Sequence, residues 1–206
     1  EWSNGQITED INNLSAGSYT VTITDQNLCI YTNTIDITQT EPISISEIHS
    51  DFDGYGVSCS GAIDGFIDVT VSGGGGIFSF DWSNGDNIED LNNIGSGNYT
   101  LTVTDQNGCS ESISVEIIEP DGIEIILDDY SDFDGYGVSC SGATDGFIDV
   151  TVTGGTGIYT YSWVSNNGFS SSEEDISNLE PAIYTLVVSD ENDCPIDIEL
   201  EITEPD

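Results

Sequence analysis

The chain has 206 residues, of which 39 are Asp or Glu and none is Lys or Arg, so its formal net charge at pH 7 is −39. Phosphate groups are bound mainly by Lys and Arg, so we expect neither nucleic acid nor an anionic membrane as a partner. With only His49 as an internal counter-charge, the carboxylates must be solvated, hydrogen-bonded or matched by cations from solution. No stretch approaches the roughly 20 apolar residues of a membrane helix, and membrane insertion is not expected.

An internal repeat organises the sequence. Residues 50–62 recur letter for letter at residues 131–143. Residues 1–42 match only the second half of the repeat, so we expect a truncated repeat there and a chain cut from something longer. Two complete repeats are predicted at residues 43–120 and 121–206. A fixed period of this kind is the signature of a repeat architecture.

The pattern within each repeat is all-β. Apolar and polar residues alternate over 67–71, which is the period of a half-buried strand. The glycine run 73–76 predicts a turn, and the apolar residues of 78–82 share one face of the next strand. Alternation returns over 99–103, and an Asn-Gly turn then leads into a last strand at 113–117. Short strands separated by turn signals predict tandem β-sandwich repeats of about 80 residues.

Two aromatic positions in each complete repeat are expected to be structural. Trp82 and Trp163 are predicted to lie in the core between the sheets. Tyr99 and Tyr184 follow corners that contain Gly or Pro, and each opens a strand. This is the placement of the tyrosine corner of β-sandwiches, and we favour that role over ligand binding.

The cysteines fit a disulfide framework. Cys59 precedes one core strand and Cys109 follows another, and Cys140 and Cys194 occupy the same two places in the next repeat. We predict the pairs Cys59–Cys109 and Cys140–Cys194, with the partner of Cys29 upstream of the chain; buried free thiols are the alternative. Each loop closure would stabilise its domain by about 4 kcal/mol. Disulfides imply an oxidising, exported location.

An acidic loop, Asp-Phe-Asp-Gly-Tyr-Gly, occurs once in each complete repeat, at residues 51–56 and 132–137, and is the sharpest candidate site. Carboxylates one residue apart, followed by Gly in a turn, offer the hard oxygen ligands and sharp bend that Ca²⁺ requires. The loop departs from an EF-hand, so further ligands must come from elsewhere. The predicted ligands are Asp51, Asp53, Asp64, Asp132, Asp134 and Asp145. The alternative is a solvated acidic turn in which Gly serves only the geometry.

The junctions between repeats are a second candidate cation site. Each repeat ends in Glu-Pro, at Glu41, Glu119 and Glu204. Asp105 and Asn107 lie in a predicted hairpin turn. Cations that bridge such groups would stiffen the array. The alternative is a short linker stiffened by Pro alone.

Several motifs agree in order and spacing with a known repeat. They are Val-Ser-Cys-Ser-Gly-Ala-Ile-Asp-Gly at 57–65, Val-Thr-Val-Ser-Gly-Gly at 69–74, Trp-Ser-Asn-Gly at 82–85, Gly-Asn-Tyr-Thr at 97–100 and Thr-Asp-Gln-Asn-Gly-Cys at 104–109. In these motifs the chain resembles the SprB repeat of very large surface adhesins of gliding Bacteroidetes. The resemblance implies an immunoglobulin-like sandwich in a secreted or cell-surface array, exported by the type IX route, that contributes to adhesion and gliding. It implies no catalytic residue.

Three functions are compatible with these observations. The first is a structural stalk segment of an SprB-like adhesin, stiffened by cations, in which neighbouring repeats of the same chain are the partners. The second is a subunit of an extracellular filament that assembles from identical repeats. The third is a carbohydrate-binding module whose loop aromatics stack on surface glycans. An enzyme is not expected: paired carboxylates could hydrolyse glycosides, but an active site normally occurs once and every acidic cluster here is repeated.

Overall fold

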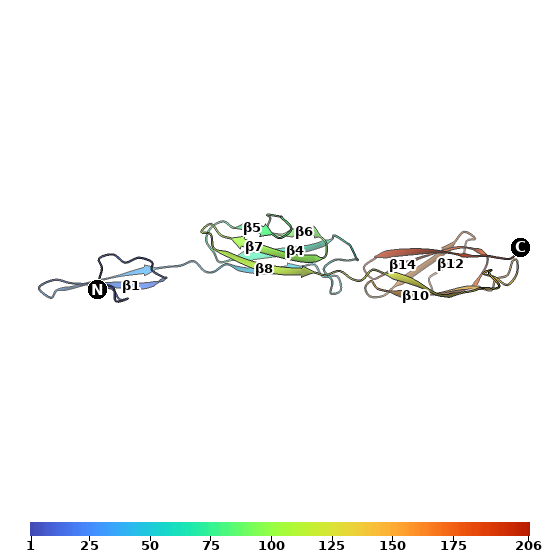
Figure 1. Cartoon of the computed structure of the whole chain (residues 1–206), viewed down its shortest axis with the longest axis horizontal. Coiled ribbons are helices and arrows are strands. Elements are labelled where there is room, and N and C mark those ends of the chain that lie inside the picture. Colours follow the sequence, from blue (N-terminus) through green and yellow to red (C-terminus); the bar gives the residue numbers. More distant parts are fainter.

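The computed structural model describes all residues from 1 to 206 and is all-β, with fifteen strands and no helix. None of it forms a helix long and apolar enough to cross a membrane. The strands gather into three bodies that follow one another along the long axis of the molecule (Figure 1). We call them repeat 1 (residues 1–42), repeat 2 (43–120) and repeat 3 (121–206).

Repeat 2 has two antiparallel sheets of three strands each. One sheet has the order β3-β4-β6 and the other has the order β5-β7-β8. The strands are β3 (Ser44–His49), β4 (Gly65–Ser72), β5 (Ser79–Trp82), β6 (Leu91–Ile94), β7 (Gly97–Thr104) and β8 (Ser110–Ile117). Buried residues of both sheets form one cluster, so the sheets face each other as two layers around a single core.

Repeat 3 has the same plan with one addition. Its sheets have the orders β13-β10-β9 and β12-β11-β14-β15. The strands are β9 (Glu124–Tyr130), β10 (Gly146–Thr153), β11 (Thr160–Ser165), β12 (Ser170–Ser171), β13 (Ile176–Leu179), β14 (Ala182–Ser189) and β15 (Pro195–Ile202). The extra β12 lies between Trp163 and Tyr184, where the sequence is four residues longer than in repeat 2.

Repeat 1 consists of one hairpin and the loops before it. Its strands β1 (Gly17–Thr24) and β2 (Ile30–Ile37) pair antiparallel, as β7 and β8 do in repeat 2. The apolar face of this hairpin lacks an opposite sheet. Trp2, Leu14 and Tyr19 therefore line an open hollow of about 240 Å³ with Ile35 and Ile37.

The cores are built by the alternation that the sequence displays. Along β4, Ile67 and Val69 are buried while Asp68 and Thr70 face solvent. Trp82 is 2% exposed and its indole N–H donates to the carbonyl of Ile88 at 2.9 Å. Burying one such apolar side chain stabilises the fold by about 1.5–3 kcal/mol.

Each tyrosine that opens the long hairpin bonds to the backbone four residues upstream. The hydroxyl of Tyr99 donates to the carbonyl of Gly95 at 3.0 Å, and that of Tyr184 to the carbonyl of Glu180 at 2.9 Å. Tyr184 is fully buried, and burial raises the pKa of its hydroxyl. The contact is the one expected of a tyrosine corner.

The loops of a repeat divide between its two ends. The early-cysteine turn (59–62) contacts the segment that leaves repeat 2, through Gly61 and Glu119. The glycine turn (73–76) and the late-cysteine turn (105–109) lie together at the opposite end, where the backbone N–H of Gln106 donates to Gly75. The corresponding turns of repeat 3 are residues 140–143, 154–157 and 190–194.

Candidate functional site: the junction between repeats

The junction between repeats 2 and 3 is formed by the linker (residues 119–122) and the turns at the facing ends of both repeats. At the entry to repeat 3, the backbone N–H of Gly155 donates to the carbonyl of Asp121 at 2.8 Å. A Cβ on Gly154, whose φ is +77°, would lie 2.0 Å from the carbonyl oxygen of Gly122. The linker backbone therefore occupies the space that a side chain would need.

The same contact recurs where repeat 2 begins. The backbone N–H of Gly74 donates to the carbonyl of Glu41 at 2.8 Å, and a Cβ on Gly73 would lie 1.9 Å from the carbonyl oxygen of Pro42. The sequence predicts a turn at this glycine run. The structure shows that the turn also binds the backbone of the preceding linker, a contact that the sequence pattern does not reveal.

A buried aspartate fixes the late-cysteine turn to the glycine turn. Asp105 is 5% exposed and accepts backbone N–H groups from Gly75, Asn107 and Cys109 at 2.8–2.9 Å. Burial alone would raise the pKa of Asp105, but the donors on Cys109, Gly75 and Asn107 outweigh it and lower the pKa below its usual value. The carboxylate that we considered as a cation ligand is therefore bound to the backbone of its own repeat.

Repeat 3 contains the equivalent arrangement around Asp190. This side chain is 3% exposed and accepts the backbone N–H and the hydroxyl of Thr156 at 2.9 and 3.1 Å. It also accepts the backbone N–H of Cys194 at 3.0 Å. Asp190 thus places Cys194 beside the linker.

The other end of the linker is held by a glutamate. The carboxylate of Glu119 accepts the backbone N–H of Gly61, in the early-cysteine turn, at 2.6 Å. In repeat 3, Glu204 accepts the backbone N–H of Gly142 at 2.8 Å and the hydroxyl of Ser141 at 3.1 Å. The glutamate of each Glu-Pro pair therefore fixes the direction in which the chain leaves its repeat.

A disulfide crosses the junction. Cys59 of repeat 2 is bonded to Cys194 of repeat 3, with Cα atoms 5.7 Å apart. The predicted pairs Cys59–Cys109 and Cys140–Cys194 are therefore wrong. Cys29, Cys109 and Cys140 are free and exposed.

Strand length explains why the predicted pairs cannot form. Cys59 lies at the end of repeat 2 where Glu119 leaves, and Cys109 lies at the end where the linker enters. The eight-residue strand β7 joins these two ends and spans about 26 Å. A disulfide needs its two Cα atoms to lie within about 7 Å of each other. This condition is met across the junction but not between the two cysteines of one repeat.

The two repeats do not share a core at this junction. Each core cluster contains residues of one repeat only. Between the ends lies a hollow of about 310 Å³, lined by Ser60 and Pro120 on one side and by Asp190 and Ile196 on the other. The disulfide and the linker hydrogen bonds hold the junction, with little help from apolar packing.

The acidic loop forms a closed turn. Phe52 and Tyr55 exchange backbone hydrogen bonds, and the Asp51 carboxylate accepts the backbone N–H of Gly54 at 2.7 Å. Asp53 occupies the turn with a φ of +54°. Asp132 accepts from Gly135 in the same way, and Asp134 has a φ of +56°.

The remaining predicted calcium ligands, Asp64 and Asp145, are hydrogen-bonded to backbone N–H groups of their own repeats. Asp64 accepts the backbone N–H of Ser58 at 3.1 Å, and Asp145 accepts that of Ser139. Hydrogen bonds from these serines lower the pKa of both carboxyls. No three His, Cys, Asp or Glu side chains in the chain are grouped closely enough to hold a metal ion. Calcium binding stays a prediction.

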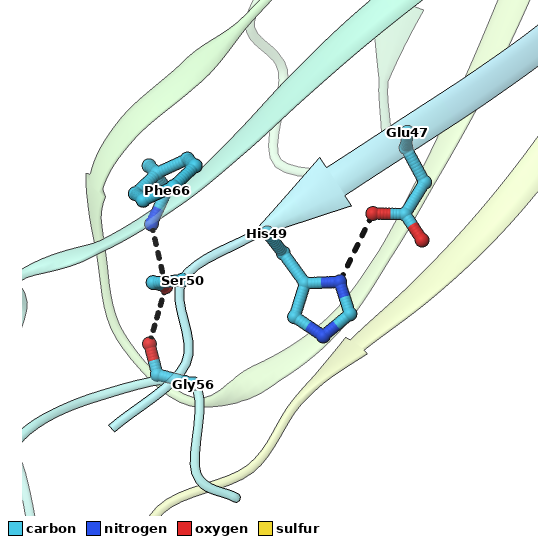
Figure 2. Close-up of polar contacts among 5 residues, drawn as sticks. All are labelled: Glu47, His49, Ser50, Gly56 and Phe66. Atoms are coloured by element: carbon cyan, nitrogen blue, oxygen red, sulfur yellow. Dashed lines mark hydrogen bonds and ion pairs between the residues drawn. The ribbon is translucent and has the colours of Figure 1, made fainter. Parts of the chain in front are cut away.

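A hollow of about 520 Å³ lies beside the acidic loop and includes His49 and Ser50. Figure 2 shows the His49 ring directed toward Glu47, 3.0 Å from its carboxylate, and away from the Ser50 hydroxyl. That hydroxyl donates to the carbonyl of Gly56 at 2.6 Å and accepts the N–H of Phe66 at 3.0 Å. Ser50 therefore ties the loop to β4, and the geometry gives it a structural role.

Comparison with known families finds a match within each complete repeat. Two segments of the chain match the model of the SprB repeat, residues 57–87 and 138–168. Each segment runs from the early-cysteine turn through the glycine turn to the strand with the core tryptophan. SprB repeats occur in extracellular surface proteins with adhesin-type repeat regions. No curated protein matches the chain.

Proposed function

Because the chain carries SprB repeats, we propose that it is a structural stalk segment of an extracellular, cell-surface repeat adhesin that serves adhesion and gliding, and that it is not an enzyme. Each complete repeat would be one immunoglobulin-like sandwich of that stalk. The observation that carries this proposal is the junction: a linker bonded to both repeats and a disulfide parallel to it.

Two separate connections between rigid bodies limit their relative motion more than one does. A linker alone would act as a hinge, whereas the linker and the Cys59–Cys194 bond together restrict bending to one axis. A stalk needs this property because its reach depends on the alignment of successive repeats. The disulfide is also the kind of bond that persists in an oxidising exterior.

The charge of the chain supports an extended array. Because the chain has a formal net charge of −39, neighbouring repeats and neighbouring chains repel one another unless cations screen the charge. The Debye length is about 10 Å at 0.1 M salt and about 3 Å at 1 M, so a saline exterior reduces this repulsion. Bound Ca²⁺ at the acidic loops is part of this proposal, because no basic side chain is present to neutralise them.

Two experiments test the proposal. On intact cells of the source organism, an antibody against residues 121–206 should label the surface; labelling only after permeabilisation would contradict a surface stalk. In solution, small-angle X-ray scattering of the oxidised chain should give one fixed maximum dimension for repeats 2 and 3. A Cys59→Ser, Cys194→Ser double variant should show a broader distribution, and an unchanged profile would mean that the disulfide does not align the repeats.

A further inference from the structure

The three free cysteines are equivalent to the two that are bonded. We propose that Cys59–Cys194 is one of a continuous series of bonds, in which the early cysteine of each repeat pairs with the late cysteine of the next. Cys140 then bonds the late cysteine of a repeat that follows repeat 3, Cys109 bonds the early cysteine of a complete repeat 1, and Cys29 bonds that of the repeat before it. This inference rests on the proposed function only in requiring further repeats of the same kind on both sides.

The exit end of repeat 3 reproduces that of repeat 2 around its cysteine. The backbone N–H of Ala143 donates to the carbonyl of Cys140 at 3.0 Å, as that of Ala62 does to Cys59. Glu204 binds the turn of Cys140 as Glu119 binds the turn of Cys59. Cys140 is therefore held where a following repeat would meet it.

The entry end of repeat 2 likewise reproduces that of repeat 3. The backbone N–H of Cys109 donates to the Asp105 carboxylate at 2.9 Å, as that of Cys194 does to Asp190 at 3.0 Å. The incoming backbone is held by Gly74 as it is held in repeat 3 by Gly155. The backbone hydrogen bonds that hold the turn of Cys194 are thus present at Cys109 as well.

Exposure separates the bonded cysteines from the free ones. Cys194 is 8% exposed and Cys59 is half-buried, whereas Cys109 and Cys140 are both exposed. The turns are the same, so the difference comes from the neighbouring repeat that covers one pair. Cys109 and Cys140 therefore lie at ends of repeats that have the turns of a junction but no partner turn packed against them.

Geometry also decides which cysteines pair. Early and late cysteines of one repeat lie at opposite ends, about a strand length apart, so a bond within a repeat is excluded. When repeats align in the same direction, each early cysteine faces the late cysteine of its successor. Each bond forms by oxidation of two thiols, whose two protons and two electrons pass to a disulfide oxidant that becomes two thiols.

An extended chain tests the proposal. Adding a second copy of residues 122–206 directly after Asp206 recreates the linker Glu-Pro-Asp-Gly letter for letter. In the added copy, Cys140→Ser leaves one cysteine, and the exposed Asp197→Ser marks its peptide by mass. The chain lacks Lys and Arg, so non-reducing peptide mapping requires a protease that cuts after Glu.

The expected map contains two bonds: Cys59 to Cys194, and Cys140 to the marked late cysteine. A control in which the marked cysteine is also Ser should leave Cys140 as a thiol. The proposal is overturned if Cys140 stays a thiol while Cys59–Cys194 is complete, or if Cys140 joins Cys194 or Cys109. Such a result leaves the surface labelling and scattering tests of the stalk unaffected.

The unextended chain provides a second measurement that does not depend on the added copy. In its native state it should titrate three thiols, at Cys29, Cys109 and Cys140, and five after reduction under denaturing conditions. A native map with Cys59–Cys109 or Cys140–Cys194 would remove the basis of the series.

Discussion

The carboxylate of Glu119 accepts the backbone N–H of Gly61 at 2.6 Å, and this contact joins the last residues of repeat 2 to the turn that carries Cys59. Since the next residues are Pro120 and Asp121, and the carbonyl of Asp121 is already bonded to repeat 3, the linker has a hydrogen bond at each end. The disulfide therefore joins two turns that the hydrogen bonds of the linker also hold in place.

Replacing Glu119 with Ala should weaken the Cys59–Cys194 bond relative to a glutathione redox buffer. Loss of one hydrogen bond to an exposed charged group is worth about 1 kcal/mol, or about fivefold in the equilibrium constant. The measurement is the ratio of oxidised to reduced protein across glutathione ratios. Glu41→Ala is the matched control, because only the carbonyl of Glu41 takes part in its junction; an equal effect there would contradict the role of the Glu119 side chain.

Gly154→Ala should destabilise repeat 3 and its contact with the linker. The added Cβ meets the carbonyl of Gly122 at 2.0 Å, and the φ of +77° disfavours any side chain. We expect a loss above 2 kcal/mol, roughly the overpacking cost added to that of a positive φ, in the free energy of unfolding by urea. Gly168→Ala is the control, since its φ is +93° and nothing lies within 4 Å of the new Cβ. Equal losses of stability in the two variants would show that the positive φ alone, and not the contact with Gly122, requires glycine at position 154.

Tyr184→Phe should lower the stability of repeat 3 by about 1 kcal/mol, because the carbonyl of Glu180 loses its buried donor. For a domain of this size the melting temperature should fall by about 4–8 °C in calorimetry. Tyr130→Phe is the comparison, since Tyr130 is 51% exposed. A larger loss at Tyr130 than at Tyr184 would refute the corner as a stabilising contact.

Asp149→Asn should stabilise repeat 3 at neutral pH. Burial, and then the negative charges of Asp175, Asp128 and Asp129, raise the pKa of Asp149. A raised carboxyl pKa means that the ionised form destabilises the fold above that pKa, and that this penalty disappears as the pH falls below the ordinary value of 3.8. The melting temperatures of variant and parent should therefore differ at pH 7 and converge near pH 3.

Asp68→Asn is the matched control for this pH dependence. Asp68 occupies the same place in β4 but pairs across the sheet with Ile48, whereas Asp149 pairs with Asp129. Like charges on directly opposite residues destabilise a sheet, and this pair is found only in repeat 3. A gain at Asp68 as large as that at Asp149 would show that general charge relief, not the local pair, is responsible.

Calcium should raise the melting temperature of the oxidised chain in a saturable manner if the acidic loops bind it. The titration starts in EDTA and uses NaCl and Mg²⁺ at matched ionic strength as controls. Asn at positions 51, 53, 132 and 134 should abolish the rise. The turn itself should survive, because the side-chain oxygen of Asn still accepts the N–H that Asp51 accepts from Gly54. If NaCl or Mg²⁺ acts equally well, the loops are only solvated turns.

Much of the fold follows from local pattern. Alternation over 67–71 and 99–103 lies within β4 and β7, and the glycine run 73–76 lies between β4 and β5. These predictions succeed because the period of apolar residues depends only on which face of a strand is buried. They concern single strands and the turns that join them.

The cysteine pairing was predicted wrongly because it depends on which end of the repeat each cysteine reaches after the chain has passed through several strands. From Cys59 the chain crosses the repeat along β4, returns through β5 and β6, and crosses again along β7 before it reaches Cys109. An odd number of crossings places the two cysteines at opposite ends. Counting the predicted strands would have excluded the Cys59–Cys109 bond. It would not have identified the residue to which Cys59 is bonded. The role of Glu119 was hidden for the same reason, since its partner Gly61 is 58 residues away.

The bond between Cys59 and Cys194 changes what happens when the chain is pulled from its two termini. It is a covalent shortcut past 135 positions of sequence, so tension entering at residue 59 passes directly to residue 194. Fully extended, the bypassed segment would be roughly 450–490 Å long, and none of that length is released while the bond is intact. When this chain is pulled from its termini, the backbone from β4 to β14 therefore carries no tension, and these strands add no length to it even if the sandwiches themselves are weak.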